Sequence, residues 1–246
     1  MTPILTLHNI SKTFQEKTQK PLLALKNISL EIKAGEFFCF LGPSGCGKST
    51  LLRIMSGLEK SFKGKIELAP GVNKSDFSFV FQHFALFPWL TVQENVGLGL
   101  IAKGVDSKTL KEEVTKQLKI FGLEKFANAY PRELSGGMKQ RVGLARALVT
   151  NPKIIFMDEP FSELDSFTAE ELRQELLRIW QERRMTIIMV SHNIEEVLEL
   201  ADRIAVLTPL PGRIEKIIDN QLPRPRNKRS QEFYRLYDEL YKIIKP

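Results

Sequence analysis

The sequence has little cysteine and no long hydrophobic run, and both shortages narrow what the chain can be. Only two of its 246 residues are cysteine, Cys39 and Cys46, and they lack a paired Cys-x-x-Cys spacing. They therefore indicate neither a disulfide framework nor a zinc site, and a reducing compartment is expected. No stretch approaches the roughly 18 apolar residues of a membrane-spanning helix, and no basic segment with an apolar core opens the sequence. We expect another chain to provide any membrane crossing.

The sequence also lacks an internal repeat with a period of roughly 20 to 50 residues. Hydrophobic residues make up 43% of the chain, which suits one large α/β domain and excludes a disordered protein. The formal charge of +7 suits nucleic acid, anionic lipid, a polyphosphate ligand or an ordinary basic surface, and it does not choose among them. A Pro/Arg-rich stretch, Leu222–Arg229, is typical of a linker.

Short apolar runs bounded by turn residues predict the strands of a parallel sheet. Continuous runs of this length are typical of strands that are buried on both faces. The runs are Phe37–Leu41, Phe77–Phe81, Ile154–Met157 and Ile187–Val190. Two earlier segments, Leu5–Ile10 and Leu25–Ile32, alternate apolar and polar residues and predict antiparallel strands in front of this core.

Helical periodicity marks two further parts of the chain. From about Val92 to Phe126 the residues Val114, Leu118 and Phe121 are spaced for one buried face, which predicts a separate helical lobe. The last segment, Gln231–Ile244, also places its apolar residues at helical spacing. Docking on the domain and binding of a partner are both compatible with this second helix.

A glycine-rich loop follows the predicted strand Phe37–Leu41 and opens a predicted helix. Its residues are Gly42, Pro43, Ser44, Gly45, Cys46, Gly47, Lys48, Ser49 and Thr50. Glycines let the backbone wrap a phosphate, and the helix N-terminus adds backbone N–H groups and a positive dipole end. Lys48 is expected to reach the β- and γ-phosphates, and the Ser49 hydroxyl to ligate Mg²⁺. A plain glycine-rich turn is the alternative, and the strand–loop–helix context argues against it.

Two adjacent carboxylates end the predicted strand Ile154–Met157. Asp158 can hold Mg²⁺ through water, as the acidic partner of a phosphate-binding loop does. Neighbouring side chains on a strand point to opposite faces. The Glu159 side chain can therefore take a direction that the strand does not dictate only if the strand ends there. Pro160 favours that ending, and Glu159 is then a candidate to polarise an attacking water. A plain surface carboxylate is the alternative.

A second glycine pair stands at the start of another predicted helix, in the run Leu134–Arg141. Ser135, Gly136 and Gly137 form a helix N-terminus that can bind an anion. Taken alone, Ser-Gly-Gly is more often a capping turn. Because this end lacks the lysine and hydroxyl of the first loop, it is expected to bind the γ-phosphate that another copy of the protein holds.

In this order the motifs resemble the nucleotide-binding subunit of ABC transporters over nearly the whole chain. The resemblance implies an α/β fold: a P-loop NTPase parallel-sheet core with an antiparallel β subdomain and an inserted α-helical subdomain. It implies an ABC ATPase domain over residues 1–225, with the helical lobe at about 90–150, and a basic linker and amphipathic helix over 226–246. ATP and Mg²⁺ are the implied cofactors, and ATP hydrolysis is the implied activity.

Further residues take roles through the resemblance. Gln82 resembles the Q-loop glutamine that senses Mg²⁺ and water, and His192 resembles the switch histidine that contacts the γ-phosphate. Asp165 closes the segment Ser162–Asp165, which resembles the D-loop. Each has a plainer alternative: a solvated glutamine, a structural histidine, and a helix N-cap at Asp165. Phe14 stands where the family has an aromatic residue that stacks on adenine, and a core phenylalanine is the alternative there.

Glu163 departs from the family pattern, which more often has alanine at this D-loop position. The departure bears on the detailed contacts between two copies. The resemblance implies that the copies close head to tail as a homodimer, with each ATP between the phosphate loop of one and Ser135–Gly137 of the other. Permease subunits in the membrane are expected to contact Gln82–Val92, whose aromatic residues are typical of contact sites.

The implied place of the chain is the cytoplasmic face of the cell membrane, as a peripheral subunit. A solute-binding protein is expected to act indirectly, and nucleic acid is not expected as a partner. The forms Leu-Phe-Pro-Trp-Leu-Thr-Val and Leu-Pro-Arg-Pro-Arg resemble importer ATPases for nitrate, sulfonate and taurine, and pyrimidine-precursor importers look similar. The alternative is a non-transport ABC ATPase of DNA repair or translation. Such proteins typically carry a coiled-coil insertion or tandem cassettes, for which this length leaves no room.

Overall fold

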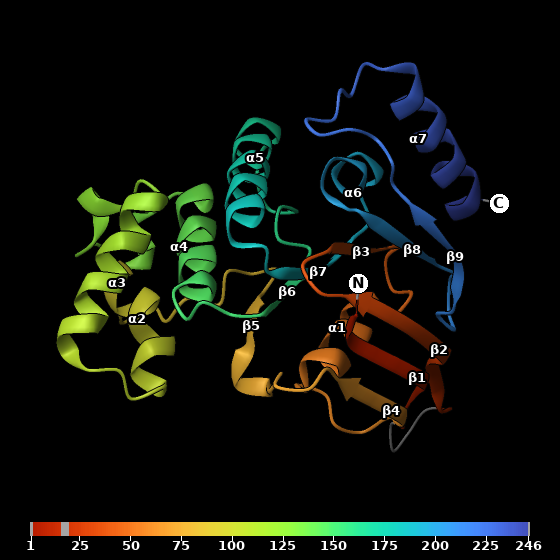
Figure 1. Cartoon of the computed structure of the whole chain (residues 1–246), viewed down its shortest axis with the longest axis horizontal. Coiled ribbons are helices and arrows are strands. Elements are labelled where there is room, and N and C mark those ends of the chain that lie inside the picture. Colours follow the sequence, from red (N-terminus) through yellow and green to blue (C-terminus); the bar gives the residue numbers. More distant parts are fainter. Residues whose placement is uncertain (1, 16–19, 246) are drawn as a thin grey trace. The chain divides into compact units, whose positions relative to one another are not determined.

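The computed structural model describes residues 2–15 and 20–245, which fall into two compact units (Figure 1). The first unit comprises Met1–Lys74 and Arg184–Pro246, and the second comprises Ser75–Arg183. Both units combine strands with helices, which confirms the α/β class. Across the described ranges, no helix is both long and apolar enough to cross a membrane.

A three-stranded antiparallel sheet opens the first unit. Its strands are β1 (Pro3–Phe14), β2 (Leu22–Lys33) and β4 (Lys63–Leu68), in the order β2-β1-β4. The predicted antiparallel segments Leu5–Ile10 and Leu25–Ile32 lie within β1 and β2 and pair with one another, so that prediction is confirmed. Alternate side chains of β2 are buried, as expected for a sheet with one covered face.

The first unit also holds four strands in the order β7-β3-β8-β9. They are β3 (Phe37–Leu41), β7 (Thr186–Ser191), β8 (Arg203–Leu207) and β9 (Ile214–Asp219). β3 is parallel to β7 and β8, while β9 is antiparallel to β8. Every residue of β3 is buried, which explains its unbroken apolar run. Leu41 lies opposite Ser191, so the loops that follow β3 and β7 leave the sheet at the same edge.

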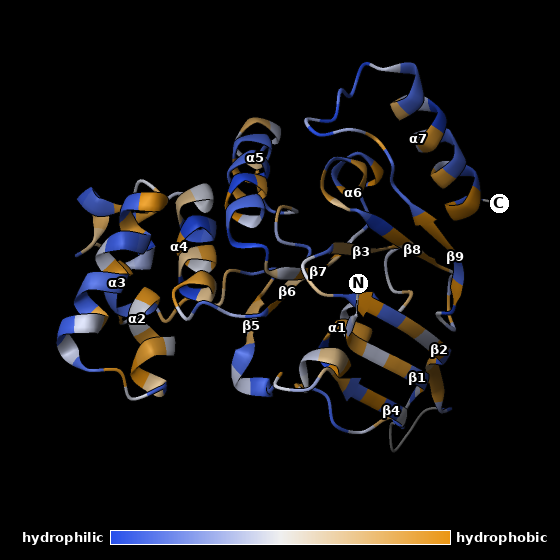
Figure 2. Ribbon diagram, in the orientation of Figure 1, coloured by the Kyte–Doolittle hydropathy of each residue, from blue (hydrophilic) through white to orange (hydrophobic). Residues whose placement is uncertain are grey.

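Three helices of the first unit matter for the site: α1 (Lys48–Ser56), α6 (Ile194–Leu200) and α7 (Gln231–Ile244). α7 has the predicted bounds and carries separate apolar and polar faces (Figure 2). Its buried residues Phe233 and Leu240 belong to the face that packs against α6 and β8. The structure therefore shows α7 docked on its own unit.

The second unit joins a parallel strand pair to a group of helices. β5 (Phe77–Val80) runs parallel to β6 (Ile154–Asp158), and β5 ends one residue before the predicted Phe81. The helices are α2 (Val92–Ala102), α3 (Ser107–Ile120), α4 (Gly136–Leu148) and α5 (Ser166–Arg183). α2 packs against α3 and α4, and Val114, Leu118 and Phe121 are buried as one face, as predicted.

Gly64 in β4 offers a test of this packing. Its φ is +105°, and an added Cβ would lie 2.5 Å from the carbonyl oxygen of His8 and 2.7 Å from that of Asn9. Both atoms are backbone, so relief requires the β1–β4 pairing to open. We expect Gly64→Ala to lower the free energy of unfolding by about 3 kcal/mol in urea denaturation.

Gly71→Ala is the matched control for Gly64→Ala. Gly71 has a φ of +76°, but no heavy atom of the described residues lies within 4 Å of an added Cβ. This variant should lose only about 1 kcal/mol through left-handed backbone strain. If both variants lost the same free energy of unfolding, the close contact with β1 would not be the reason for glycine at position 64.

Candidate functional site

The glycine-rich loop Gly42–Thr50 connects β3 to α1 in the first unit (Figure 1). α1 begins at Lys48, and its N-cap residue is Gly47, which has no side chain to cap the first turn. Lys48, Ser49 and Thr50 follow, so the first turn holds a cation and two hydroxyls and no carboxylate. The N–H groups and positive dipole end of such a helix favour an anion. The predicted strand–loop–helix arrangement is therefore present.

Two glycines of the loop are required for different reasons. An added Cβ on Gly47 would lie 2.8 Å from Leu25 Cδ2 and 3.1 Å from the Ala24 carbonyl oxygen, so β2 approaches the loop too closely for a side chain. Gly45 has a φ of +78°, and no described heavy atom lies within 4 Å of an added Cβ there. Gly45 thus serves the backbone turn, while Gly47 also serves close packing.

Lys48 lies across the inside of the loop. Its Nζ donates to the carbonyl oxygens of Gly42 and Pro43, at 2.9 Å each, and its side chain is buried. The ammonium group is therefore held beside the start of the loop. A positive charge in this position, next to the N-terminus of α1, suits a bound phosphate.

His192 follows β7, at the edge of the sheet where the glycine-rich loop follows β3. The residues on both sides of His192 are tied together, because the Ser191 hydroxyl accepts from the Asn193 N–H at 3.0 Å and donates to the Glu196 carboxylate. The Asn193 side chain in turn caps α6 by accepting from the Glu196 N–H at 3.2 Å. His192 itself is exposed. Its backbone position is therefore set by Ser191, Asn193 and the first turn of α6.

Phe14 is the last residue of β1, and the structure does not bury it in the core. Its side chain is 39% exposed, and the Lys12 ammonium lies 4.7 Å from its ring centroid. Phe14 and Lys12 line a hollow of about 500 Å³ together with Phe62 and Lys63. An exposed ring with a cation at one face is available for stacking against a planar ligand.

In the second unit, the parallel pairing of β5 and β6 brings Gln82 and the Asp158–Glu159 pair to one sheet edge. Asp158 is the last residue of β6 and is buried. Glu159 has a φ of 44°, so the strand ends there, as Pro160 predicted. The Gln82 amide donates to the Ser162 hydroxyl at 3.4 Å, and that hydroxyl donates to the Glu159 carbonyl at 3.0 Å. The structure thus joins the glutamine to the loop that follows the two carboxylates.

The Ser135–Gly137 segment opens α4. The Ser135 hydroxyl accepts from the Met138 N–H at 3.3 Å, so this serine is a helix cap in the structure. An added Cβ on Gly137 would lie 2.5 Å from Thr168 Cγ2 in the first turn of α5. The glycine is therefore needed where α4 meets α5, and the backbone at this helix start is free of a Cβ.

Asp165 is a helix N-cap in the structure, which is the plainer of the two roles considered for it. Its carboxylate accepts from the Thr168 N–H at 3.0 Å at the start of α5, and this hydrogen bond lowers the pKa of Asp165 below its ordinary value. The aspartate therefore acts as a cap and stabilises the conformation of the Ser162–Asp165 loop.

One contact was not predicted from the sequence. His83 Nδ1 lies within hydrogen-bond distance of Glu163 Oε1. The glutamate that departs from the family pattern therefore faces the residue directly after Gln82. These two residues are 80 positions apart, and no local pattern in the sequence connects them. Only the adjacency of the β5 and β6 ends brings them together.

The donor groups suit a metal that arrives with a nucleotide. Within the described part of the chain, no group of three or more His, Cys, Asp or Glu side chains is placed to hold a metal ion. Mg²⁺ in nucleotide sites is bound through one or two protein oxygens together with substrate phosphates and water. The Ser49 hydroxyl in the first unit and the Asp158 carboxylate in the second are each an oxygen donor of the kind that Mg²⁺ takes.

Comparison with known proteins extends these local observations to the whole chain. The family model described as "ABC transporter" matches residues 25–162. An aliphatic sulfonates import ATP-binding protein of Bacillus cereus is 42% identical, covering 93% of this chain and 90% of the relative. A nitrate import ATP-binding protein of Synechocystis sp. is 41% identical, covering 98% and 95%. A solved dimeric ATP-binding cassette in a post-hydrolysis state with ADP and phosphate has 36% identity and a TM-score of 0.77, covering 88% and 99%.

The contact between His83 and Glu163 can be tested by a double-mutant cycle. We expect His83→Ala and Glu163→Ala to be coupled by less than about 1 kcal/mol of unfolding free energy, because both side chains are partly exposed to solvent. Strictly additive effects of the two substitutions would show that the contact is not formed in solution.

Proposed function

The chain belongs to the ABC transporter family, and we propose that it is the ATP-hydrolysing subunit that energises an importer of small sulfonate- or nitrate-like solutes. The observation that carries this proposal is the similarity to two import ATP-binding proteins at 42% and 41% identity over nearly their full lengths. A non-transport ATPase of DNA repair or translation has no comparable support.

Nucleotide binding is assigned to the first unit. Backbone N–H groups of Gly42–Thr50 would surround the phosphates, and Lys48 would pair with the β- and γ-phosphates from its place inside the loop. Phe14 would stack on adenine, which its exposed ring at the wall of a hollow supports. Mg²⁺ would offset phosphate charge and orient the phosphates when bound, with Ser49 as its proposed ligand in this unit and Asp158 and Gln82 as the oxygen donors proposed for it in the second unit.

Three side chains are assigned to the hydrolytic step. Glu159 would accept a proton from the attacking water, a role that its position just beyond the end of β6 supports. His192 would donate a hydrogen bond to the γ-phosphate from the loop between β7 and α6, which we call the switch loop. Gln82 would hold the water and report the state of the site through its hydrogen bond to Ser162.

We further propose that two copies complete the site. The related ATP-binding cassette with ADP and phosphate is dimeric, which supports a homodimer here. In this arrangement the start of α4, with Ser135, Gly136 and Gly137, would approach the γ-phosphate held by the other copy. Asp165 would shape the D-loop between the two copies. ATP would then bind the closed dimer better than the open one, so hydrolysis would release closure.

The permease contact is assigned to Gln82–Val92 in the second unit. Phe87 and Trp89 are 42% and 69% exposed, and Phe87 also lines a hollow of about 450 Å³ beside α2 and α4. Arg146 holds the preceding turn by donating to the carbonyls of Phe84 and Ala85, at 3.0 and 2.8 Å. Exposed aromatics on a braced loop suit a protein interface. The chain would lie at the cytoplasmic membrane face, and a solute-binding protein would meet the permease instead of this subunit.

Replacing the proposed general base gives a direct test. Glu159→Gln should lower ATP turnover by at least roughly 100-fold, because the amide cannot accept the proton, while ATP and Mg²⁺ still bind. ATP should then trap a dimer that size-exclusion chromatography detects. Glu182→Gln, an exposed change on α5, is the matched control and should keep full turnover. Normal turnover in Glu159→Gln would reject the assignment of the base, and a missing dimer would count against the two-copy site.

The permease surface can be tested separately from the chemistry. Trp89→Ala should leave the ATPase activity of the isolated chain unchanged, because Trp89 is exposed and outside the nucleotide site. In vesicles reconstituted with permease and solute-binding protein, it should lower solute-stimulated ATPase activity by roughly tenfold or more. The control is Tyr234→Ala, which removes another exposed aromatic side chain, on α7. Its solute-stimulated ATPase activity should equal that of the unaltered protein. Full stimulation of Trp89→Ala would place the permease elsewhere.

A further inference from the structure

The short helix α6 leaves carbonyl groups at its C-terminal end that need donors. α6 spans only Ile194–Leu200, and the last four carbonyls of a helix have no donor within it. The Val197 carbonyl accepts from the Ala201 N–H at 2.9 Å. The carbonyls of Leu198, Glu199 and Leu200 must find donors outside the helix.

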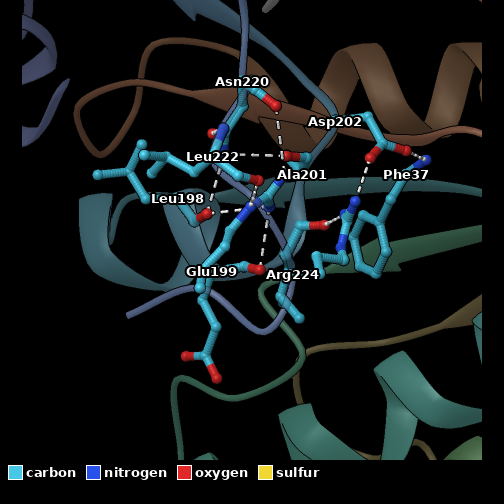
Figure 3. Close-up of polar contacts among 10 residues, drawn as sticks. Phe37, Leu198, Glu199, Ala201, Asp202, Asn220, Leu222 and Arg224 are labelled. Atoms are coloured by element: carbon cyan, nitrogen blue, oxygen red, sulfur yellow. Dashed lines mark hydrogen bonds and ion pairs between the residues drawn. The ribbon is translucent and has the colours of Figure 1, made fainter. Parts of the chain in front are cut away.

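The Pro/Arg-rich stretch supplies these donors. Arg226 Nη1 donates to the Leu198 and Glu199 carbonyls, at 3.0 Å each, and Arg224 Nη2 donates to the Leu200 carbonyl. The Asn220 amide donates to the Leu198 and Ala201 carbonyls, at 2.9 and 3.0 Å (Figure 3). Although its composition is typical of a linker, this segment caps α6. We call Asn220, Arg224 and Arg226 the α6 clamp.

The clamp also reaches the strand that leads into the glycine-rich loop. Arg224 Nη1 pairs with one carboxylate oxygen of Asp202, and the other oxygen accepts from the Phe37 N–H at 3.0 Å (Figure 3). The Asp202 N–H returns a hydrogen bond to the Phe37 carbonyl at 2.7 Å. Phe37 is the first residue of β3, whose opposite end enters the loop at Gly42. One guanidinium thus connects the end of α6 with the start of β3.

The other end of α6 sets the position of the switch loop. Asn193 caps α6, and the Ser191 hydroxyl donates to the carboxylate of Glu196 in its first turn. His192 lies between these two anchors. A helix of seven residues is not stable alone, so its position depends on what holds its ends. Ser191 is held by β7, so Asn193 is the anchor whose position depends on that of α6.

We propose that Arg226 and Arg224 are positioning residues for His192, acting through α6. The inference rests on the proposed role of His192 in hydrolysis. The clamp fixes the C-terminal end of α6, and α6 then holds Asn193 on one side of His192, while β7 holds Ser191 on the other side at the sheet edge beside the glycine-rich loop. Lysine cannot replace Arg226 fully, because Nη1 serves the Leu198 and Glu199 carbonyls while Nε and Nη2 donate to the carbonyls of Leu222 and Asn220, and a single ammonium cannot stand for three nitrogens in one plane.

The surroundings of Arg226 support this assignment. Burial lowers the pKa of its guanidinium to about 10, with Arg224 contributing in the same direction. If the segment served only to attach α7 to the first unit, it would not require two neighbouring guanidiniums directed at the end of α6. Two cations suit this place because they complement the negative end of the α6 dipole as well as the carbonyls that lack donors within the helix.

The test compares Arg226→Gln with Arg229→Gln, which removes the same charge from an exposed position three residues away. In Arg226→Gln, kcat for ATP should fall roughly tenfold or more, while KM should change less than about threefold because the glycine-rich loop is untouched. Arg229→Gln should match the unaltered protein. The kcat of Arg226→Lys should lie between those of Arg226→Gln and the unaltered protein. If Arg226→Gln does not fold, Arg226→Lys replaces it in the test.

A spectroscopic readout separates positioning from general stability. The chain has three histidines, so selectively labelled imidazole resonances can be assigned with His8→Gln, His83→Gln and His192→Gln. Arg226→Gln should shift or broaden the His192 resonance and leave those of His8 and His83 in place. If Arg226→Gln lowers only the melting temperature, and both kcat and the His192 resonance are unchanged, the clamp is merely a tether and the inference is overturned.

His192→Ala distinguishes failure of the inference from failure of the proposed function. Full turnover in His192→Ala would reject the role assigned to the histidine, whatever Arg226→Gln does. If His192→Ala is impaired, Arg226→Gln in that background should cause no further loss of kcat, because both changes act through one side chain. An additional tenfold loss would show that the clamp acts by another route and would overturn the inference.

Discussion

Parallel pairing between strands that are distant in the sequence is the constraint on which the site depends. β3 pairs with β7 so that Leu41 lies opposite Ser191, and β5 pairs with β6 so that Val80 lies opposite Met157. In each pair the carboxyl ends meet at one edge, where loops of α/β proteins carry ligand-binding residues. The glycine-rich loop and His192 thereby become neighbours in one unit. Gln82 and the Asp158–Glu159 loop become neighbours in the other.

Two helix ends treat their backbone groups that lack partners within the helix in opposite ways. α1 begins after glycines, so its N–H end stays available to an anion. α6 ends in carbonyls that the protein covers itself, with Asn220, Arg224 and Arg226. One helix end is left for the ligand and the other is closed by cations of the same chain. The closed end gives the loop around His192 a fixed base, and the open end remains available to an anion.

Several residues hold two roles without conflict. Ser135 caps α4, and Asp165 caps α5, as the plainer alternatives for both residues required. Capping does not compete with a role at an interface between copies, since it fixes the backbone that such an interface needs. Glu163, which departs from the family pattern, contacts His83 and so joins the segment Ser162–Asp165 to the segment Gln82–Val92. The departure is therefore accommodated within the second unit.

The sequence by itself determined the elements whose signal is local. The apolar run Phe37–Leu41 predicted β3 with its correct bounds, the periodicity of Gln231–Ile244 predicted α7, and Pro160 predicted the end of the strand before Glu159. The glycine-rich loop was also readable, because its chemistry depends on nine consecutive residues. The order of motifs then indicated the family, which the matches over most of the chain confirmed.

Only the tertiary structure decided contacts between distant segments. Composition made Leu222–Arg229 resemble a linker, because proline and arginine say nothing about which acceptors lie nearby. The carbonyls of α6 turned Arg224 and Arg226 into a clamp, and strand adjacency turned His83 and Glu163 into a pair. Local conformation follows from residue type and spacing, whereas a backbone group at a helix end accepts any donor that the fold brings within reach. Its partner is therefore chosen by the packing of the whole unit.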